Sequence, residues 1–366
     1  MASLTRMQGW NNPAADRIFE SRRRKGDSAS VHSTRSKDRE TAAFFYSHMQ
    51  VIGQELNDAT AAFGIRLDAP HDGGRILDFC MAPGGFLRFA KDINRTSSVT
   101  AFSLPIASGG HDVFIELDSS IELKFLDITM LASDMGAEHI PEDHADRQNF
   151  FPKQLPDGRL FDLILCDGQV LRTHERAPYR EKEREARRLT STQLALGLEH
   201  VKAGGTMIVL LHRLESCDTV ELLQKFATFS TVRLFKPKSG HATRSSFYMI
   251  ATNIQSEDPK VALAVQYWKH IWNVATFGTV EDFEKIISMD KGAAEKLLDE
   301  FGSELIRLGT EVWAVQAQAL ANSSFIKDDG AGASTQHENA RPDPQRPGRW
   351  VRGGGKWRLR AEHQRT

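Results

Sequence analysis

The stretch LDFCMAPGGF occupies residues 77–86 and runs directly into LRFAKDI. Its apolar start is typical of a buried strand, its proline and two glycines indicate a tight turn, and the residues after them have helical spacing. A strand, a turn and a helix in this order place Asp78 at the carboxyl edge of a sheet. There the bare backbone of Gly84 and Gly85 would let a ligand approach closely. A strand-to-helix connection without any ligand is the alternative for this motif alone.

The sequence on either side of this motif alternates between apolar runs and helical patterns. Helices are expected over 86–93, 190–204 and 219–229, and apolar runs that are buried on both faces favour parallel strands. The expected strands are 75–80, 99–104, 114–117, 122–128, 161–167, 206–212, 231–236 and 246–252. The pattern predicts an α/β fold with a mostly parallel sheet and helices on both faces.

Composition restricts the class of protein. The 366 residues are 40% hydrophobic, and the formal net charge is −1. No apolar run is long enough for a membrane span and no secretory signal is recognisable, so we expect an intracellular protein, cytoplasmic or nuclear, with no membrane contact. Cys80, Cys166 and Cys217 have no CxxC spacing, which indicates reduced thiols and no metal site.

The chain divides into four predicted parts. Residues 1–40 form a flexible polar and basic arm, 41–255 the α/β domain, 256–325 a helical extension and 326–366 a disordered basic tail. The arm and the tail are too poor in aliphatic residues to bury a core. The extension has apolar residues at helical spacing but shows no recognisable chemistry.

Three acids follow or end predicted strands: Asp78, Asp127 and Asp167. Because the carboxyl ends of parallel strands meet at one edge, we expect the three carboxylates to lie together. Taken singly, each acid is also explained as a helix N-cap or a solvated loop residue. Taken jointly, they favour a ligand with an ammonium group, hydroxyls and an amino group, all of which donate hydrogen bonds to carboxylates.

Five motifs in order resemble the FtsJ-like (RrmJ-type) methyltransferases, which transfer a methyl group from S-adenosylmethionine to ribose 2′-hydroxyls of RNA. The resemblance covers about residues 41–253. The motifs are LDFCMAPGGF, FLDITML, FDLILCD, LTSTQLALGLEHVKAGGTMIVLL and FKPKSGHATRSSFYMIAT. The resemblance implies a Rossmann-like methyltransferase fold with S-adenosylmethionine as cofactor.

The same resemblance implies the residues of the site. Asp78 would lie beside the cofactor's ammonium, Asp127 at its adenine, and Asp167 beneath its methionine part as a member of the catalytic set. Ser103 stands where the family usually has a ribose-binding acid. The complete implied cofactor site consists of Asp78, Pro83, Gly84, Gly85, Phe86, Ser103, Asp127 and Asp167.

The chain departs from the family at its catalytic residues. Leu210 stands at the position of the strand lysine, Ser246 at that of the final glutamate, and the N-terminal lysine falls within 44–48. His212 lies two residues beyond Leu210, faces the same side of the strand and is a candidate catalytic base. The alternative is a strand-end histidine held by a neighbour such as Glu215.

RNA is the expected partner. The segment 172–188 contains seven basic and four acidic residues and is predicted to overhang the active edge, where it would gather phosphates. A solvated helix with internal salt bridges explains the same segment. Arginines interleaved with Trp350 and Trp357 give the tail a similar possible role. The oligomeric state has no signature in the sequence.

Three readings of the function follow. The first is an S-adenosylmethionine-dependent methyltransferase acting on RNA. The second is a catalytically silent FtsJ-like module that binds the cofactor or RNA, because Leu210 and Ser246 replace the lysine and glutamate of the family. The third is an interaction protein on an inherited fold.

Overall fold

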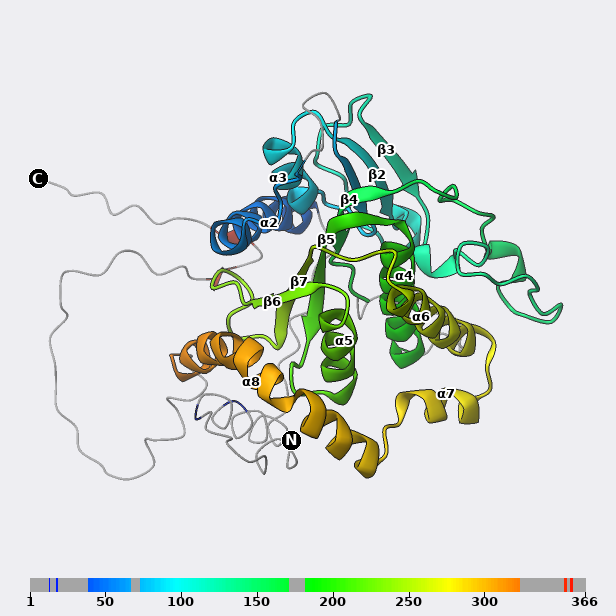
Figure 1. Cartoon of the computed structure of the whole chain (residues 1–366). Coiled ribbons are helices and arrows are strands. Elements are labelled where there is room, and N and C mark those ends of the chain that lie inside the picture. Colours follow the sequence, from blue (N-terminus) through cyan, green and yellow to red (C-terminus); the bar gives the residue numbers. More distant parts are fainter. Residues whose placement is uncertain are drawn as a thin grey trace, which may run out of the picture. The chain divides into compact units, whose positions relative to one another are not determined.

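The computed structural model describes residues 39–66, 73–170 and 182–322, together with Pro13, Ile18 and the segments 352–353 and 356–357. Its centre is a seven-stranded sheet with the strand order β3-β2-β1-β4-β5-β7-β6 (Figure 1). The strands are β1 (Arg75–Asp78), β2 (Ser98–Ser103), β3 (Ile121–Phe125), β4 (Phe161–Cys166), β5 (Val201–His212), β6 (Thr231–Phe235) and β7 (Ser246–Thr252).

The sheet is mostly parallel, as predicted. Strands β3, β2, β1, β4 and β5 run parallel to one another, and β7 runs antiparallel between β5 and β6. The chain moves outward from β1 to β3 and then returns to β4 beside β1. The strand order therefore reverses between β1 and β4, which is where open α/β sheets bind their ligands.

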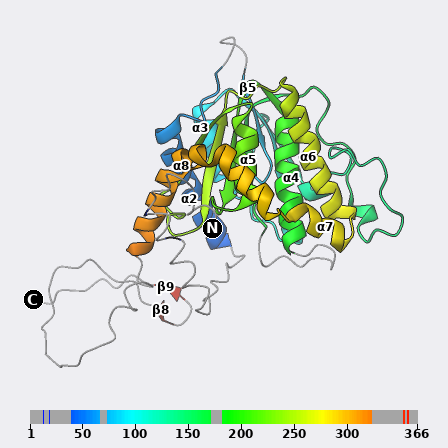
Figure 2. The ribbon, with the colours of Figure 1, turned by 60° about the horizontal axis from the view of Figure 1, so that its bottom comes forward.

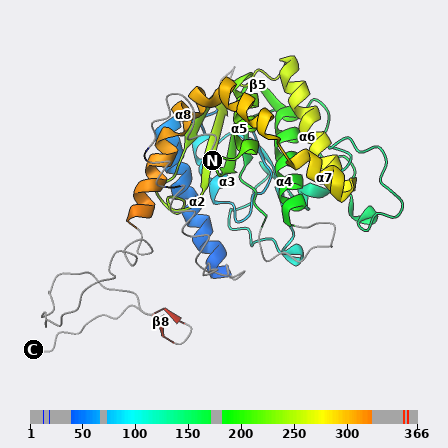
Figure 3. The same ribbon diagram turned by 90° about the horizontal axis from the view of Figure 1, so that it is seen from below.

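Helices cover both faces of the sheet. Successive strand residues point to opposite faces, and apolar residues on each face pack against a different set of helices. Leu163 and Leu165 pack in one cluster with α2 (Arg39–Thr60) and α3 (Gly85–Ile93). Ile164 and Cys166 pack in the other cluster, with residues of four further helices. These are α4 (Lys182–His200), α5 (Cys217–Ala227), α6 (Pro259–Phe277) and α8 (Lys291–Ala321). Figure 2 shows α6 alongside α4 and α8 beside α5, and Figure 3 shows the same helices from below.

The predicted strand at 114–117 is wrong. This segment is a loop between β2 and β3, in which the Phe114 amide donates to the Pro83 carbonyl at 3.0 Å. Ile115 is 5% exposed and packs against Gly84. Ile115 therefore covers the turn after β1 and is buried without strand pairing, whereas Leu117 is exposed.

The predicted helix over 190–204 differs from α4 at both ends. The helix starts earlier, at Lys182, and ends at His200, where β5 begins and Val201 pairs with Phe161. Gly204 has a φ of +78°, a left-handed conformation that glycine adopts easily and that is not compatible with a continuing helix. The glycines that interrupt the apolar pattern here thus lie inside the long strand β5.

The C-terminal helical region forms α6, α7 (Val280–Ile287) and α8, as expected from its periodicity. The described residues up to Asn322 belong to one compact unit, and the short strands β8 (Arg352–Gly353) and β9 (Lys356–Trp357) to a second. Within the predicted arm, the described residues Pro13, Ile18, Arg39 and Glu40 are helical, and Ile18 is buried. The rest of the arm and of the tail lies outside the described residues, and the proposed domain boundaries stay predictions.

No helix within the described ranges is long and apolar enough to cross a membrane. The compartment of the protein stays a prediction.

Candidate active site

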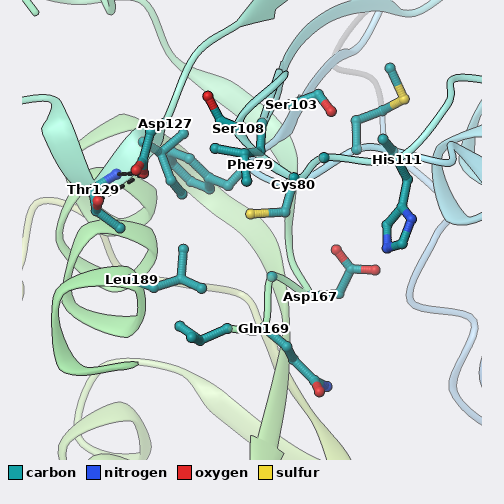
Figure 4. A pocket seen from close by; sticks show the side chains of 18 of the residues that line it. Phe79, Cys80, Ser103, Ser108, His111, Asp127, Thr129, Asp167, Gln169 and Leu189 are labelled. Atoms are coloured by element: carbon teal, nitrogen blue, oxygen red, sulfur yellow. Dashed lines mark hydrogen bonds between the residues drawn. The ribbon is translucent and has the colours of Figure 1, made fainter. Parts of the chain in front are cut away.

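A cavity of about 1340 Å³ opens at the carboxyl edge of the sheet. Its walls are the segments that follow β1, β2, β3 and β4, with side chains from α2, α4, β5 and β7 (Figure 4). The cavity lies at the switch point between β1 and β4. Its volume exceeds the roughly 300–1,000 Å³ of an ordinary ligand pocket, so it has room for a cofactor and part of a substrate.

Most of the predicted site residues line this cavity: Pro83, Gly84, Gly85, Phe86, Ser103, Asp127 and Asp167. Asp78 and His212 are not among the lining residues. The structure therefore brings the glycine turn and two of the three acids together, and it places the third acid behind them.

The two glycines of the turn have different roles. Gly84 has a φ of +98°, and an added Cβ would meet the Ile115 Cγ2 at 2.8 Å. At Gly85 an added Cβ would lie 2.0 Å from the carbonyl oxygen of Tyr46 in α2. The missing side chain of Gly85 thus lets α2 and α3 pack closely, and the approach of a ligand to this glycine stays a prediction.

Asp78 is 1% exposed and accepts a hydrogen bond from the Cys80 amide at 3.1 Å. Burial, together with the nearby Asp167, raises the pKa of Asp78 well above its usual range. Burial also raises the pKa of Asp167 to about 7. Burial therefore favours the protonated form of both carboxyl groups, and Asp167 is the member that faces the cavity. Asp78 thus lies behind the lining residues, and its contact with the cofactor's ammonium stays a prediction.

Asp127 and Ser103 lie on the β2–β3 side of the cavity. Asp127 caps the short helix η3 (Ile128–Met130), because its Oδ1 accepts from the Thr129 amide at 2.9 Å and from the Thr129 hydroxyl at 2.7 Å. Asp127 is thus an N-cap that also lines the cavity, and its contact with the cofactor's adenine stays a prediction. Figure 4 shows Asp127 and Asp167 on opposite sides of Cys80.

A buried ion pair fixes the wall behind Asp127. Arg188 of α4 is 0% exposed, and its Nη1 lies 3.1 Å from the Glu185 Oε2. Its Nη2 donates to the Thr129 carbonyl at 2.9 Å, and its Nε donates to the Thr276 hydroxyl of α6 at 3.1 Å. Trp272 of α6 donates to the same Thr129 carbonyl at 2.9 Å. The C-terminal region therefore supports the residue that holds Asp127.

A second arginine of α4 also points inward. Arg184 is 8% exposed and donates to the carbonyls of Gly278 at 3.1 Å and Thr279 at 2.7 Å. It thus bonds the carbonyls at the C-terminal end of α6, where a cation is favourable. The prediction that 172–188 is a basic rim is corrected for Arg184 and Arg188, and residues 171–181 lie outside the described residues.

The departures from the family's catalytic set lie around β5 and β7. Leu210 lines the cavity and pairs with Tyr248, which also lines it. Ser246 is 1% exposed, and its Oγ lies 2.5 Å from the Nδ1 of His241. His212 is exposed, and its pKa is lowered by partial desolvation and the nearby Lys236. The structure does not bring His212 to the cavity.

Several lining residues escaped the sequence analysis. They are Phe44, Phe45, His48, Glu185, His241 and Arg244. Gln193 of α4 was also missed. It accepts from the Gly168 amide at 3.0 Å and holds the segment just after Asp167. The available signals were the FFYSH and SGHATRSS stretches, which lie where the family places other catalytic groups.

Comparison with known proteins identifies the family. Residues 56–254 match the FtsJ-like methyltransferase family. Ribosomal RNA small subunit methyltransferase B of Pectobacterium carotovorum is 28% identical over 161 residues, which are 42% of this chain and 33% of that protein. The chain thus spans about a third of the length of this curated relative, and the same holds for its counterpart in Pectobacterium atrosepticum.

Solved structures show only a distant likeness. TrmN from Thermus thermophilus has a TM-score of 0.31 at 19% identity and covers 56% of this chain and 49% of its own. Human N-acetylserotonin methyltransferase has a TM-score of 0.33 at 13% identity and covers 66% of each chain. Scores this low carry no functional argument. The family match, in contrast, covers more than half of the 366 residues, and the chain therefore belongs to the FtsJ-like methyltransferase family.

Proposed function

We propose that this protein transfers a methyl group from S-adenosylmethionine to RNA, with a ribose 2′-hydroxyl as the acceptor. Family membership supports the methyltransferase class, and the resemblance of five ordered motifs supports the acceptor. The observation that carries the proposal is the presence of Asp127 and Asp167 in one large cavity at the switch point of the sheet.

The residues of the cavity suit S-adenosylmethionine. Asp127, Ser103 and the turn after β1 offer carboxylate, hydroxyl and carbonyl oxygens, which match the amino, hydroxyl and ammonium donors of this molecule. Arg244 is the one lysine or arginine among the described lining residues, and it precedes β7, at a distance in the sheet from β3. When bound, the cofactor supplies a methyl group on a sulfonium, which is already activated for transfer.

Asp167 is the candidate proton acceptor. Its pKa, raised by burial to about 7, lies near neutral pH, where a general base is most effective. In the proposed reaction the hydroxyl oxygen bonds to the methyl carbon, the carbon–sulfur bond breaks with its electrons going to sulfur, and the hydroxyl proton goes to Asp167. Leu210 cannot exchange protons, so alignment of the reacting atoms replaces the contribution of the family's lysine. We assign no step to His212.

A cofactor- or RNA-binding module without transfer is the second candidate. Leu210 puts an apolar side chain into the cavity where the family has a lysine. Ser246 is buried against His241 where the family has a glutamate. Methyl transfer separates the two candidates, because both bind the cofactor or RNA and only the first moves a methyl group.

Label transfer decides between them. The full-length protein is incubated with methyl-tritiated S-adenosylmethionine and total RNA, protein extract or small metabolites, and each fraction is counted. We expect label in RNA, recovered after digestion as 2′-O-methylnucleosides. Asp167→Asn should slow transfer at least about tenfold, or 1.4 kcal/mol of barrier. The matched control is Asp157→Asn, an exposed acid outside the cavity. Label confined to another fraction, or an undiminished Asp167→Asn rate, would contradict the proposal.

A further inference from the structure

One side of the cavity's mouth carries an exposed aromatic face. Phe44 of α2 lines the cavity and is 61% exposed. Its ring lies nearly parallel to that of His48, one helical turn later, with the ring centroids 5.3 Å apart and 15° between the planes. Single exposed phenylalanines are common on protein surfaces. This one forms a flat stack with a second lining residue at the opening of the proposed active site.

The aromatic face is fixed against the segment 236–246. Glu55 of α2 accepts from the backbone amides of Lys238 at 2.9 Å and Ser239 at 3.2 Å. An added Cβ at Gly240 would lie 1.8 Å from the His48 Nε2, so the imidazole packs directly on this glycine. The mouth is therefore preorganised, which lowers the conformational entropy that the protein loses when a ligand binds.

The same segment brings a positive charge to the mouth. Arg244 is exposed, lines the cavity and forms no ion pair with any other described residue. The buried Lys236 donates to the carbonyls of Arg244 and Ser246, the latter at 2.7 Å, and so anchors the backbone beneath Arg244. Burial and the nearby Arg244 lower the pKa of His241 to about 3, so this imidazole is neutral.

The acidic lining residues come from other elements. Asp127, Asp146 and Asp167 follow strands or lie in the loop after β3, and Glu185 comes from α4. The cavity is thus divided into a region of acids and a region with an arginine and an exposed aromatic stack. An anionic ligand is attracted to the second region and repelled from the first.

We infer that the mouth holds one unpaired nucleotide of the RNA substrate, with its base stacked on Phe44 and its phosphate at Arg244. This inference rests on the proposed function and names the part of RNA that the site recognises. A flat base matches the flat Phe44–His48 face, and stacking of this kind holds single strands without base-specific bonds. Bases inside an A-form duplex expose no such face, so the nucleotide must be unpaired.

Binding of a fluorescein-labelled, unpaired 12-nucleotide RNA to the full-length protein tests the inference. Anisotropy titrations are run with excess S-adenosylhomocysteine at several salt concentrations. Phe44→Ala and Phe44→Leu should each weaken binding about tenfold, because both lose the aromatic face. Phe125→Ala is the matched control, since Phe125 is 53% exposed on β3 and does not line the cavity.

The two halves of the proposed contact have separate signatures. Arg244→Gln should reduce the slope of log Kd against log salt by about 0.7, the value for one phosphate contact on a single strand. The Phe44 variants should keep the wild-type slope. Phe44→Ala binding that equals wild-type binding overturns the inference. A Phe44→Ala defect confined to self-association, measured by sedimentation, assigns the face to a second copy of this chain and also overturns it.

Failure here is distinguishable from failure of the proposed function. If the wild-type protein methylates RNA and Phe44→Ala binds the oligonucleotide normally, the inference fails and the proposed function stands. If binding depends on Phe44 but no methyl group is transferred, the inference stands and the silent module replaces the enzyme. Absence of both oligonucleotide binding and transfer rejects both.

Discussion

Replacing Arg188 by methionine removes a buried cation that joins α4 to the cavity wall and to α6. Arg188 is 0% exposed and its partner Glu185 is 7% exposed at the side chain, so neither charge is solvated by bulk water. The substitution takes the Arg188 cation away from the buried Glu185 carboxylate. It also removes the bonds of 2.9 Å to the Thr129 carbonyl and 3.1 Å to the Thr276 hydroxyl.

Breaking such a buried pair from one side costs about 3–5 kcal/mol. At about 2–4 °C per kcal/mol, Tm should fall by roughly 6–20 °C. The double variant Arg188→Met with Glu185→Gln should recover part of this loss, because it no longer buries the negative charge of Glu185. The adjacent Arg187 is the matched control. Its ion pair with Asp218 is partly exposed, so Arg187→Met should cost less than about 1 kcal/mol.

Urea unfolding followed by circular dichroism gives the free energy of unfolding of all four proteins. Calorimetric titration with S-adenosylhomocysteine gives the affinity of the cavity for this ligand. We expect weaker cofactor binding by Arg188→Met, since Thr129 both accepts from Arg188 and donates to Asp127. An Arg188→Met protein as stable as Arg187→Met would refute the buried network. So would a double variant less stable than Arg188→Met alone.

Three further predictions follow from the site. Burial raises the folded-state pKa of Asp167 to about 7, so the folded protein holds this proton more tightly than the unfolded chain does. The free energy of unfolding should therefore fall as the pH rises from about 4 to 7. Asp167→Asn should therefore exceed wild type in urea stability at pH 8, by about 1–2 kcal/mol in a cavity that admits water, and equal stabilities would contradict the raised pKa. Gly85→Ala should lower Tm because its Cβ meets α2 at 2.0 Å, whereas Gly64→Ala, with only ordinary contacts, should not; scanning calorimetry compares them. Label-transfer assays should find His212→Ala as active as wild type, and a lost His212→Ala activity would restore that histidine as the base. Circular dichroism should find Leu210→Lys folded, since Leu210 faces the cavity, and an unfolded variant would contradict that placement.

The sheet was predictable because buried strands leave continuous apolar runs. Seven of the eight expected strands exist, and their alternation with helices indicated the parallel order. The eighth, 114–117, failed because a short run with apolar residues does not by itself specify strand pairing, and here only Ile115 is buried while Leu117 is exposed. Ile115 is buried against Gly84, a contact between distant positions that no local pattern reveals.

The site was predictable only in part. Strand ends marked Asp127 and Asp167, and both line the cavity. Asp78 does not line the cavity, because it is still paired within β1, next to Ala101 and Leu165, and its contact with the cofactor stays a prediction. Arg188 looked like a surface residue, because its spacing from Glu185 is that of a solvated helix pair. Its other partners lie 59 and 88 residues away, beyond any pattern on the helix itself.

The most direct test of the account is calorimetric titration of S-adenosylhomocysteine into the wild-type protein and Asp127→Asn. Asparagine is an equally good N-cap, so its oxygen can keep the bonds from Thr129 while the negative charge that faces the cavity is lost. We expect binding by the wild type, at least about tenfold weaker binding by Asp127→Asn, and equal Tm values for the two proteins. No heat from the wild type, or equal affinity in both proteins, would show that this cavity is not the cofactor site.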